Sequence, residues 1–112
     1  MAGAGGFLCG LDAAVAVVGG KWKPLILWAL SERPRRTSEL RRELEGVPEK
    51  VLIGQLRDLE RDGIVHREVF PEVPPKVVYR LTEVGEELDR ALAPLGDWGE
   101  RHLTAIADLR RH

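Results

Sequence analysis

The chain has 112 residues, of which 44% are hydrophobic and 31% are charged, which is enough for one folded domain with a modest core. No apolar run approaches the roughly 20 residues of a membrane span, the single cysteine excludes an internal disulfide, and the three histidines lack metal-ligand spacing. We therefore expect a cytoplasmic protein without membrane contact, metal or cofactor, and the net charge of −1 argues weakly against a nucleic-acid partner.

Two apolar helices are predicted near the N-terminus. Residues 1–8 lack the basic and apolar regions of a signal peptide and are expected to form a flexible tail. A short apolar helix follows at 11–18 and ends at Gly19-Gly20, because glycine adopts the left-handed conformation common at helix C-termini. Pro24 suits the first turn of a second helix, which ends before Pro34 and is apolar on most of its surface. Such a helix is predicted to be buried on several sides.

A helix-turn-helix pattern follows. Arg35-Arg36 is expected to add a strand of one or two residues to a later hairpin. Thr37 or Ser38 is predicted to cap a third helix that runs to about Glu45. Pro48 opens a fourth helix at a position where its missing N–H costs nothing. The predicted buried stripe of this fourth helix consists of Val51, Leu52, Leu56 and Leu59.

A hairpin and a long helix complete the chain. Period-two alternation predicts strands at residues 65–70 and 76–81, and the loop between them holds three prolines. Thr82 is expected to cap a fifth helix, which Pro94 should kink or split. The predicted fold is mainly α with a small β-hairpin, a winged helix-turn-helix with added N- and C-terminal helices. This plan delivers one helix to a DNA major groove and a loop to the flanking backbone.

The basic residues gather in the segment that would face DNA. Residues 33–80 hold eleven basic and nine acidic side chains, whereas residues 81–112 hold four basic and seven acidic ones. The leucine stripe turns the other face of the fourth helix outward, where side chains can reach base edges, thymine methyl groups or phosphates. The alternative is that these charges form ordinary solvated helix faces. The candidate DNA-binding residues are Arg36, Ser38, Arg41, Arg42, Glu49, Lys50, Ile53, Gly54, Arg57 and Lys76.

Several motifs resemble the HxlR family of bacterial winged-helix regulators, and the similarity extends from about Cys9 to Trp98. The resemblance implies a homodimeric transcriptional regulator that binds inverted-repeat operators in double-stranded DNA. It divides residues 9–112 into a DNA-reading unit at 33–81 and dimerisation helices at 11–18 and 82–110. The motifs are Gly19-Gly20-Lys21-Trp22, Ser38-Glu39-Leu40, Leu56-Arg57-Asp58-Leu59-Glu60-Arg61-Asp62-Gly63 and Val73-Pro74-Pro75-Lys76-Val77-Val78-Tyr79-Arg80-Leu81-Thr82.

Two features could make the regulator respond to a signal. Cys9 stands where several members of the family carry a thiol sensor for electrophiles or oxidants, and a thiolate near a helix N-terminus reacts readily. The alternative is that Cys9 is a small apolar residue packed beside its neighbours. Aromatic side chains could also line a pocket for a flat apolar ligand at a dimer interface, or they could simply pack the core and interface. The pocket candidates are Phe7, Trp22, Trp28 and Trp98.

Other functional classes have less support in the sequence. An enzyme is not expected, because no nucleophile–histidine set, phosphate-binding loop or metal spacing is present. The serious alternative is a winged-helix protein-interaction module without specific DNA binding. For a DNA-binding regulator of this size without an activation domain, repression is the commoner outcome.

Overall fold

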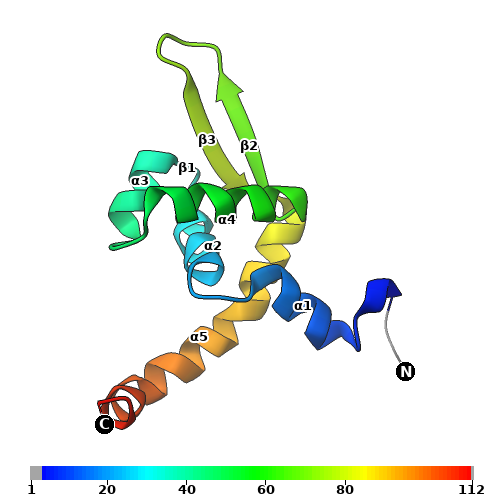
Figure 1. The fold of residues 1–112 in the computed structure, drawn as a ribbon, viewed down its shortest axis with the longest axis vertical. Helices are drawn as coiled ribbons and strands as arrows, with labels where there is room; N and C mark the ends of the chain where they lie inside the picture. Colours follow the sequence, from blue (N-terminus) through cyan, green and yellow to red (C-terminus); the bar gives the residue numbers. More distant parts are fainter. Residues whose placement is uncertain (1–3, 112) are drawn as a thin grey trace.

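The computed structural model describes residues 4–111 and has the predicted winged helix-turn-helix plan (Figure 1). The three strands form one antiparallel sheet in the order β1-β3-β2, so the short strand before the helix-turn-helix does join the hairpin as predicted. The elements are η1 (Ala4–Gly6), α1 (Gly10–Val18), α2 (Trp22–Glu32), β1 (Arg35–Arg36), α3 (Thr37–Glu43), α4 (Glu49–Arg61), β2 (Val65–Phe70), β3 (Lys76–Leu81) and α5 (Glu83–Leu109).

The segment before α1 was predicted as a flexible tail over residues 1–8. Residues 1–3 lie outside the described residues, and η1 is one turn of 3-10 helix. The backbone N–H of Leu8 donates to Asp12 Oδ2 at 2.9 Å. The residues directly before α1 are therefore tied to the first turn of that helix.

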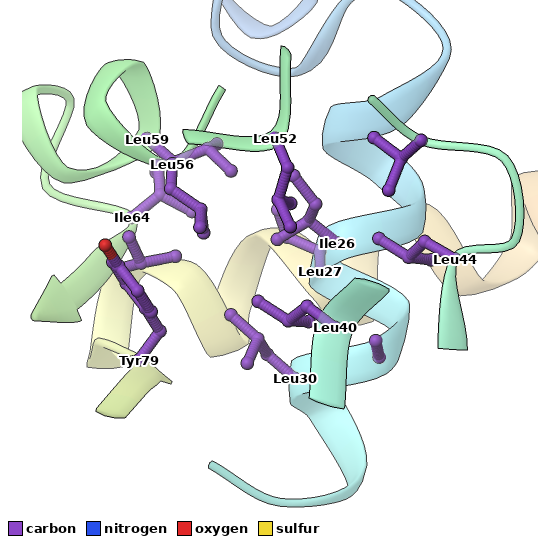
Figure 2. Packing of buried hydrophobic residues seen from close by; sticks show 13 residues of the cluster. Ile26, Leu27, Leu30, Leu40, Leu44, Leu52, Leu56, Leu59, Ile64 and Tyr79 are labelled. Carbon is purple, nitrogen blue, oxygen red and sulfur yellow. The ribbon is translucent and has the colours of Figure 1, made fainter. Parts of the chain in front are cut away.

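The core forms around α2, which contacts α3, α4, α5 and β3. Ile26, Leu27, Ala29 and Leu30 of this helix are all buried, which confirms that α2 is covered on several sides. Figure 2 shows Ile26, Leu27 and Leu30 among leucines from α3 and α4 and Tyr79 from the sheet. The apolar character of α2 thus reflects its place at the centre of the domain.

The buried stripe of α4 is narrower than predicted. Leu52, Leu56 and Leu59 are fully buried, but Val51 is 39% exposed, so its assignment to the stripe was wrong. A helix turns by about 100° per residue, and Val51 therefore lies about a quarter-turn or more from the line that joins the three leucines. The contacts of α4 with α2, α3 and β2 do not reach that far around the helix.

The start and end of α3 also differ from the prediction. Arg36 is the N-cap, and Thr37 and Ser38 are the first helical residues rather than the caps. Pairing of β1 with β3 holds Arg36 in an extended conformation, and Glu39 Oε1 accepts from the Arg36 backbone N–H at 2.9 Å. The helix ends at Glu43, two residues earlier than expected.

The last helix, α5, is capped as predicted and covers nearly the whole predicted range. The backbone N–H of Gly85 donates to Thr82 Oγ1 at 3.0 Å, which confirms Thr82 as the N-cap. Pro94 does not split the helix, which runs for 27 residues. Proline removes a single N–H donor, and the turns on either side retain enough hydrogen bonds to keep the segment helical.

Apolar side chains remain exposed on α1 and on the distal part of α5. Leu11 and Val15 belong to α1, and Leu95, Trp98 and Leu103 belong to α5. Both helices lie on the side of the molecule away from the hairpin (Figure 1). The core described above leaves these two faces uncovered.

Among the described residues, no single helix is long and apolar enough to cross a membrane. Helices α1 and α2 pass that test only when taken together, and they are bent by 79° relative to each other.

Candidate nucleic-acid interface

The outward face of α4 carries most of the predicted base-reading residues. Glu49, Lys50, Gly54 and Arg57 are exposed and Ile53 is half-buried, because the leucine stripe holds the opposite face in the core. A Cβ added at Gly54 would meet no atom within 4 Å, so this turn of the helix is open to a close approach. The structure therefore brings these five residues together on one accessible helix face.

The acidic residue at the start of α4 is paired across the turn. Arg41 Nη1 lies 3.6 Å from Glu49 Oε1, and both side chains are largely exposed. An exposed pair of this kind contributes little to stability. It does neutralise Glu49 in the free protein and leaves Arg42 as the other exposed cation at the end of α3.

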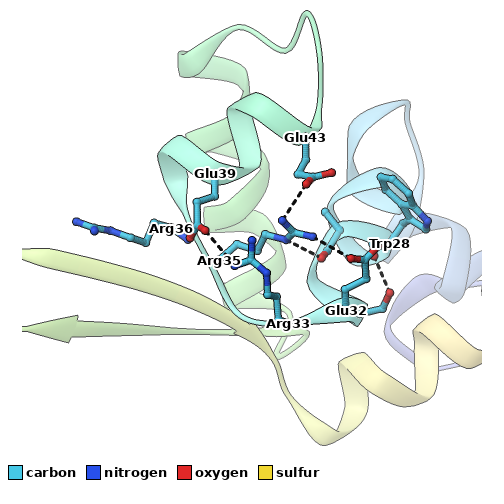
Figure 3. A network of polar contacts seen from close by, with 9 residues as sticks. Trp28, Glu32, Arg33, Arg35, Arg36, Glu39 and Glu43 are labelled. Carbon is cyan, nitrogen blue, oxygen red and sulfur yellow. Dashed lines mark hydrogen bonds and ion pairs between the residues drawn. The ribbon is translucent and has the colours of Figure 1, made fainter.

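A buried guanidinium joins α2, β1 and α3 (Figure 3). The side chain of Arg35 is only 3% exposed; its Nε donates to the carbonyl oxygen of Ala29 at 3.0 Å. Its Nη1 donates to Glu43 at 3.0 Å and its Nη2 contacts Glu32 at 3.4 Å. Arg35 thus fixes the C-terminal end of α2 against α3 and is unavailable to DNA.

Arg33 also pairs with a carboxylate, but at the surface of the protein. Arg33 Nη1 donates to Glu39 Oε2 at 3.0 Å, while the other carboxylate oxygen of Glu39 binds the backbone N–H of Arg36. This backbone hydrogen bond, followed by the Arg33 side chain, lowers the pKa of Glu39. The side chain of Arg36 points away from this network, exposed beside Ser38 at the start of α3 (Figure 3). The predicted cluster of arginines therefore presents fewer free cations than the sequence suggests.

The hairpin supplies the wing. Lys76 stands at the start of β3 with its Nζ 5.2 Å from the centre of the Phe70 ring, a cation–π contact between the two paired strands. Arg80 pairs with Glu68 across the two strands. Of the candidate DNA-binding residues, Lys76 is the one that the wing contributes.

A hollow of about 450 Å³ separates α4 from the sheet. Sequence reasoning missed two of its polar residues, Thr37 and Arg67. The alternation in β2 predicts that Arg67 lies on the same sheet face as Val65. Only the packing of α4 beside that face shows that Arg67 lines a hollow next to the helix. The hollow is lined by Thr37, Ile53, Arg57, Glu60, Arg67, Val77 and Tyr79.

The candidate sensor thiol stands at the beginning of α1. Cys9 is the N-cap of that helix, has extended backbone angles and is exposed as a free thiol. Its side chain makes no capping hydrogen bond. The packing alternative is therefore not supported within the single chain, because the side chain is not buried beside its neighbours.

The four aromatic pocket candidates do not surround one cavity within a single chain. Phe7 is half-buried, and Trp22 is half-buried against the core with Lys21 Nζ 4.7 Å from its ring centre. Trp98 is half-exposed, and its ring centre lies 4.8 Å from that of His102. Trp28 alone of the four lines an open groove of about 750 Å³ between α2 and α5.

This groove has apolar walls and an acidic rim. Leu25, Trp28 and Leu92 form part of the walls, and Asp89 and Glu100 are among the acidic residues. Partial burial raises the pKa of Asp89, and the neighbouring Arg90 opposes that shift. Across residues 4–111, no cluster of three metal-ligating side chains is present here or elsewhere.

Comparison with known proteins agrees with this architecture. The HxlR-like helix-turn-helix family model matches residues 17–107. An uncharacterized HTH-type transcriptional regulator, YdeP of Bacillus subtilis (strain 168), is 41% identical over 101 residues, which cover 90% of this chain and 79% of YdeP.

Two solved structures are also similar. The redox regulator HypR in its reduced form has a TM-score of 0.84 and 38% identity, covering 89% of this chain and 99% of HypR. Diamide-treated YodB from B. subtilis has a TM-score of 0.72 and 33% identity, covering 83% of this chain and 93% of YodB. These findings assign the chain to a family of regulators rather than enzymes, and the chain is a member of the HxlR-like helix-turn-helix family of transcriptional regulators.

Proposed function

We propose that this protein is a homodimeric repressor that binds an inverted-repeat operator in double-stranded DNA and acts in the cytoplasm, where that DNA lies. The observation that carries the proposal is the outward face of α4, on which Lys50, Ile53, Gly54 and Arg57 follow one another at helical spacing. The helix has 13 residues, and its length of about 20 Å suits a major groove.

The chemistry of this face fits base reading. Among the described residues, neither Lys50 nor Arg57 has a carboxylate partner, so both cations are available to guanine edges or phosphates. Ile53 offers an apolar surface to a thymine methyl, and Gly54 allows the backbone close to the bases. Arg36, Ser38 and the wing lysine are exposed or half-exposed around the helix, where phosphate contacts would set its register.

The uncovered apolar faces support the dimer. Leu11 and Val15 on α1 and Leu95, Trp98 and Leu103 on α5 are each exposed over half or more of their surface, and apolar faces of this kind mark interaction sites. A symmetric dimer formed through these helices would place two copies of α4 about one turn of DNA, roughly 34 Å, apart.

The first experiment is fluorescence anisotropy with a labelled duplex from the region upstream of the gene, at several salt concentrations, with a scrambled duplex as control. Lys50→Ala and Arg57→Ala should each weaken operator binding by about 1–3 kcal/mol. Arg90→Ala on α5 removes the same charge away from α4 and should bind as the wild type does. Unchanged binding in both α4 variants would contradict the proposed reading face.

The dimer has an independent test. Sedimentation equilibrium should give twice the chain mass for the wild type and a monomer for Leu95→Glu. Val73→Glu places the same charge on a fully exposed apolar side chain of the wing and should leave the mass unchanged. A wild-type monomer at micromolar concentration would contradict the homodimer.

The alternative, a protein-interaction module, would bind cognate and scrambled duplexes equally weakly. A regulator should instead prefer the operator and show a steep dependence on salt, because each neutralised phosphate releases counterions.

We also propose that oxidants or electrophiles control DNA binding through Cys9. The thiol is exposed at the N-terminus of α1, beside the apolar face assigned to the dimer, and two similar structures belong to a redox regulator and a diamide-treated protein. As the chain has one cysteine, the available products are a disulfide between subunits, a mixed disulfide or an alkylated thiol.

Diamide treatment should release the wild type from DNA, and dithiothreitol should restore binding after either disulfide forms. Cys9→Ser should bind DNA and ignore diamide, whereas equal release of this variant would contradict a thiol switch. The second proposed signal is a flat apolar ligand that binds in the groove beside Trp28. Such a ligand should quench the tryptophan fluorescence of the wild type, and this quenching should be lost in Trp28→Leu.

A further inference from the structure

The hollow between α4 and the sheet is lined by two arginines that come from different elements. Arg57 is on α4, one turn beyond Ile53, and Arg67 is in the middle of β2. Both are exposed side chains that line the same space. Residues that converge in this way from a helix and a strand are brought together only by the tertiary fold.

The strand register explains why Arg67 faces α4. Residues 65, 67 and 69 share one sheet face, because side chains alternate along a strand. Val65 on that face is buried in the core, and Arg67 pairs with buried Tyr79 on β3. Arg67 is therefore the residue on the α4 side of β2 that stands just beyond the edge of the core.

Neither of these two guanidinium groups has a carboxylate partner among the described residues, whereas six of the thirteen arginines do. Within the described residues, Glu60 lines the same hollow but lies within ion-pair distance of neither group. Two cations held near each other without a counter-ion favour an anion between them, and guanidinium groups bind phosphate oxygens in bidentate geometry. The arginines with ion-pair partners in the structure are Arg33, Arg35, Arg41, Arg61, Arg80 and Arg111.

The place of the hollow indicates which anion it meets. When α4 occupies a major groove and the hairpin lies beside the duplex, the DNA strand that separates that groove from the next passes between the two elements. Side chains in the space between α4 and the hairpin would face the sugar-phosphate backbone. The base edges would face the outer surface of α4. Thr37, at the start of α3, adds a hydroxyl donor to the same wall.

We infer that this hollow is a phosphate-binding site for the DNA backbone, held by Arg57 and Arg67. The inference rests on the proposed DNA-binding function and refines it. Arg57 and Arg67 supply affinity that does not depend on sequence, and Lys50 with Ile53 carries the base reading. The carboxylate of Glu60, which lines the same hollow, repels the phosphate and lowers the affinity for DNA.

The test measures Kd for the operator and for a scrambled duplex between 50 and 300 mM salt. Arg67→Ala should weaken binding to both duplexes by the same factor, about tenfold, and should reduce the salt slope by about one. Arg67→Lys should keep the slope and lose less affinity. The matched control is Arg80→Ala, on the opposite face of the same sheet, which should change neither quantity.

A gain-of-function variant separates a binding site from a folding defect. Glu60→Gln removes the carboxylate from the hollow and should tighten binding to both duplexes by about twofold to fivefold, because like charges repel at this range. Thermal unfolding followed by circular dichroism should show the wild-type midpoint for Arg67→Ala.

The outcomes distinguish this inference from the proposed function. Operator-selective binding by the wild type together with wild-type binding by Arg67→Ala would overturn the phosphate site alone. Weaker binding by Glu60→Gln, or a loss confined to the operator in Arg67→Ala, would also overturn it, since the second result describes base reading. Failure of the wild type to bind any duplex, including a random pool, would overturn both proposals.

Discussion

Gly85 joins the long C-terminal helix to the end of the helix-turn-helix, and replacing it with alanine should destabilise the domain. A Cβ at this position would lie 2.1 Å from the carbonyl oxygen of Ile64 and 3.1 Å from its carbonyl carbon. The same oxygen accepts the backbone N–H of Thr82 at 3.0 Å, and Thr82 in turn caps α5. Both atoms in the clash belong to the backbone or to a buried Cβ, so no flexible side chain can move to relieve it.

The magnitude follows from opposing effects. Relieving the contact requires a shift of about 1 Å, and overpacking of this kind costs about 1–3 kcal/mol. That shift also weakens the hydrogen bond from Thr82 to Ile64 and the one from Gly85 to Thr82, each contributing about 0.5–1.5 kcal/mol. Alanine is the better helix former by about 1 kcal/mol, which recovers only part of this loss. The free energy of unfolding should therefore fall by about 2–4 kcal/mol for Gly85→Ala.

Urea denaturation, followed by tryptophan fluorescence at one fixed protein concentration, measures this change. The control is Gly54→Ala, because a Cβ there meets no atom within 4 Å and the variant should gain about 0.5–1 kcal/mol from helix propensity alone. Stability of Gly85→Ala equal to or above that of the wild type would refute the close approach of α5 to Ile64.

Three further predictions concern Gly54, Arg35 and Glu39. Gly54→Ala, although more stable, should bind the operator more weakly than the wild type in the anisotropy assay if the α4 backbone approaches the bases, and equal affinity would argue against such an approach. Arg35→Met should lower the free energy of unfolding by about 2–4 kcal/mol in the urea assay, because it leaves the Ala29 carbonyl without the Arg35 donor and removes two charge-assisted hydrogen bonds. The control Arg33→Met removes an exposed ion pair and should cost less than about 1 kcal/mol. The pKa of Glu39 lies below its ordinary value of 4.5, so its ionised form stabilises the fold at neutral pH, and this stabilisation is lost as the pH falls below about 4.5. Glu39→Gln should therefore show a smaller drop in urea midpoint than the wild type between pH 7 and pH 3. An identical drop in both proteins would contradict this prediction.

Much of the architecture could be predicted from local patterns. Periods of two and 3.6 residues gave the strands and helices, Thr82 was identified as a cap, and the apolar character of the second helix indicated its central burial. These features depend on residues close together in the chain, where side-chain chemistry acts on its own backbone. The family resemblance, carried by the motifs around Lys21-Trp22 and the wing, agrees with the family match over residues 17–107.

The roles of the arginines could not be predicted in this way. Arg35 and Arg36 are adjacent and chemically identical, yet one is buried in a network of carboxylates and the other is exposed at the start of α3. Their positions are set by the pairing of β1 with β3, residues more than forty positions away. A one-residue step along a strand reverses the direction of the side chain, and no local signal states which face the core will cover.

The sequence by itself determined the element order and the helix face that carries Lys50 and Arg57, because both follow from local spacing, and its motifs indicated the family by resemblance. Only the tertiary structure decided that Val51 lies outside the core, that Pro94 leaves α5 continuous, and that Arg57 and Arg67 line one hollow. The physical reason is that burial and charge pairing depend on which distant surfaces come into contact, and those contacts form when the whole chain packs.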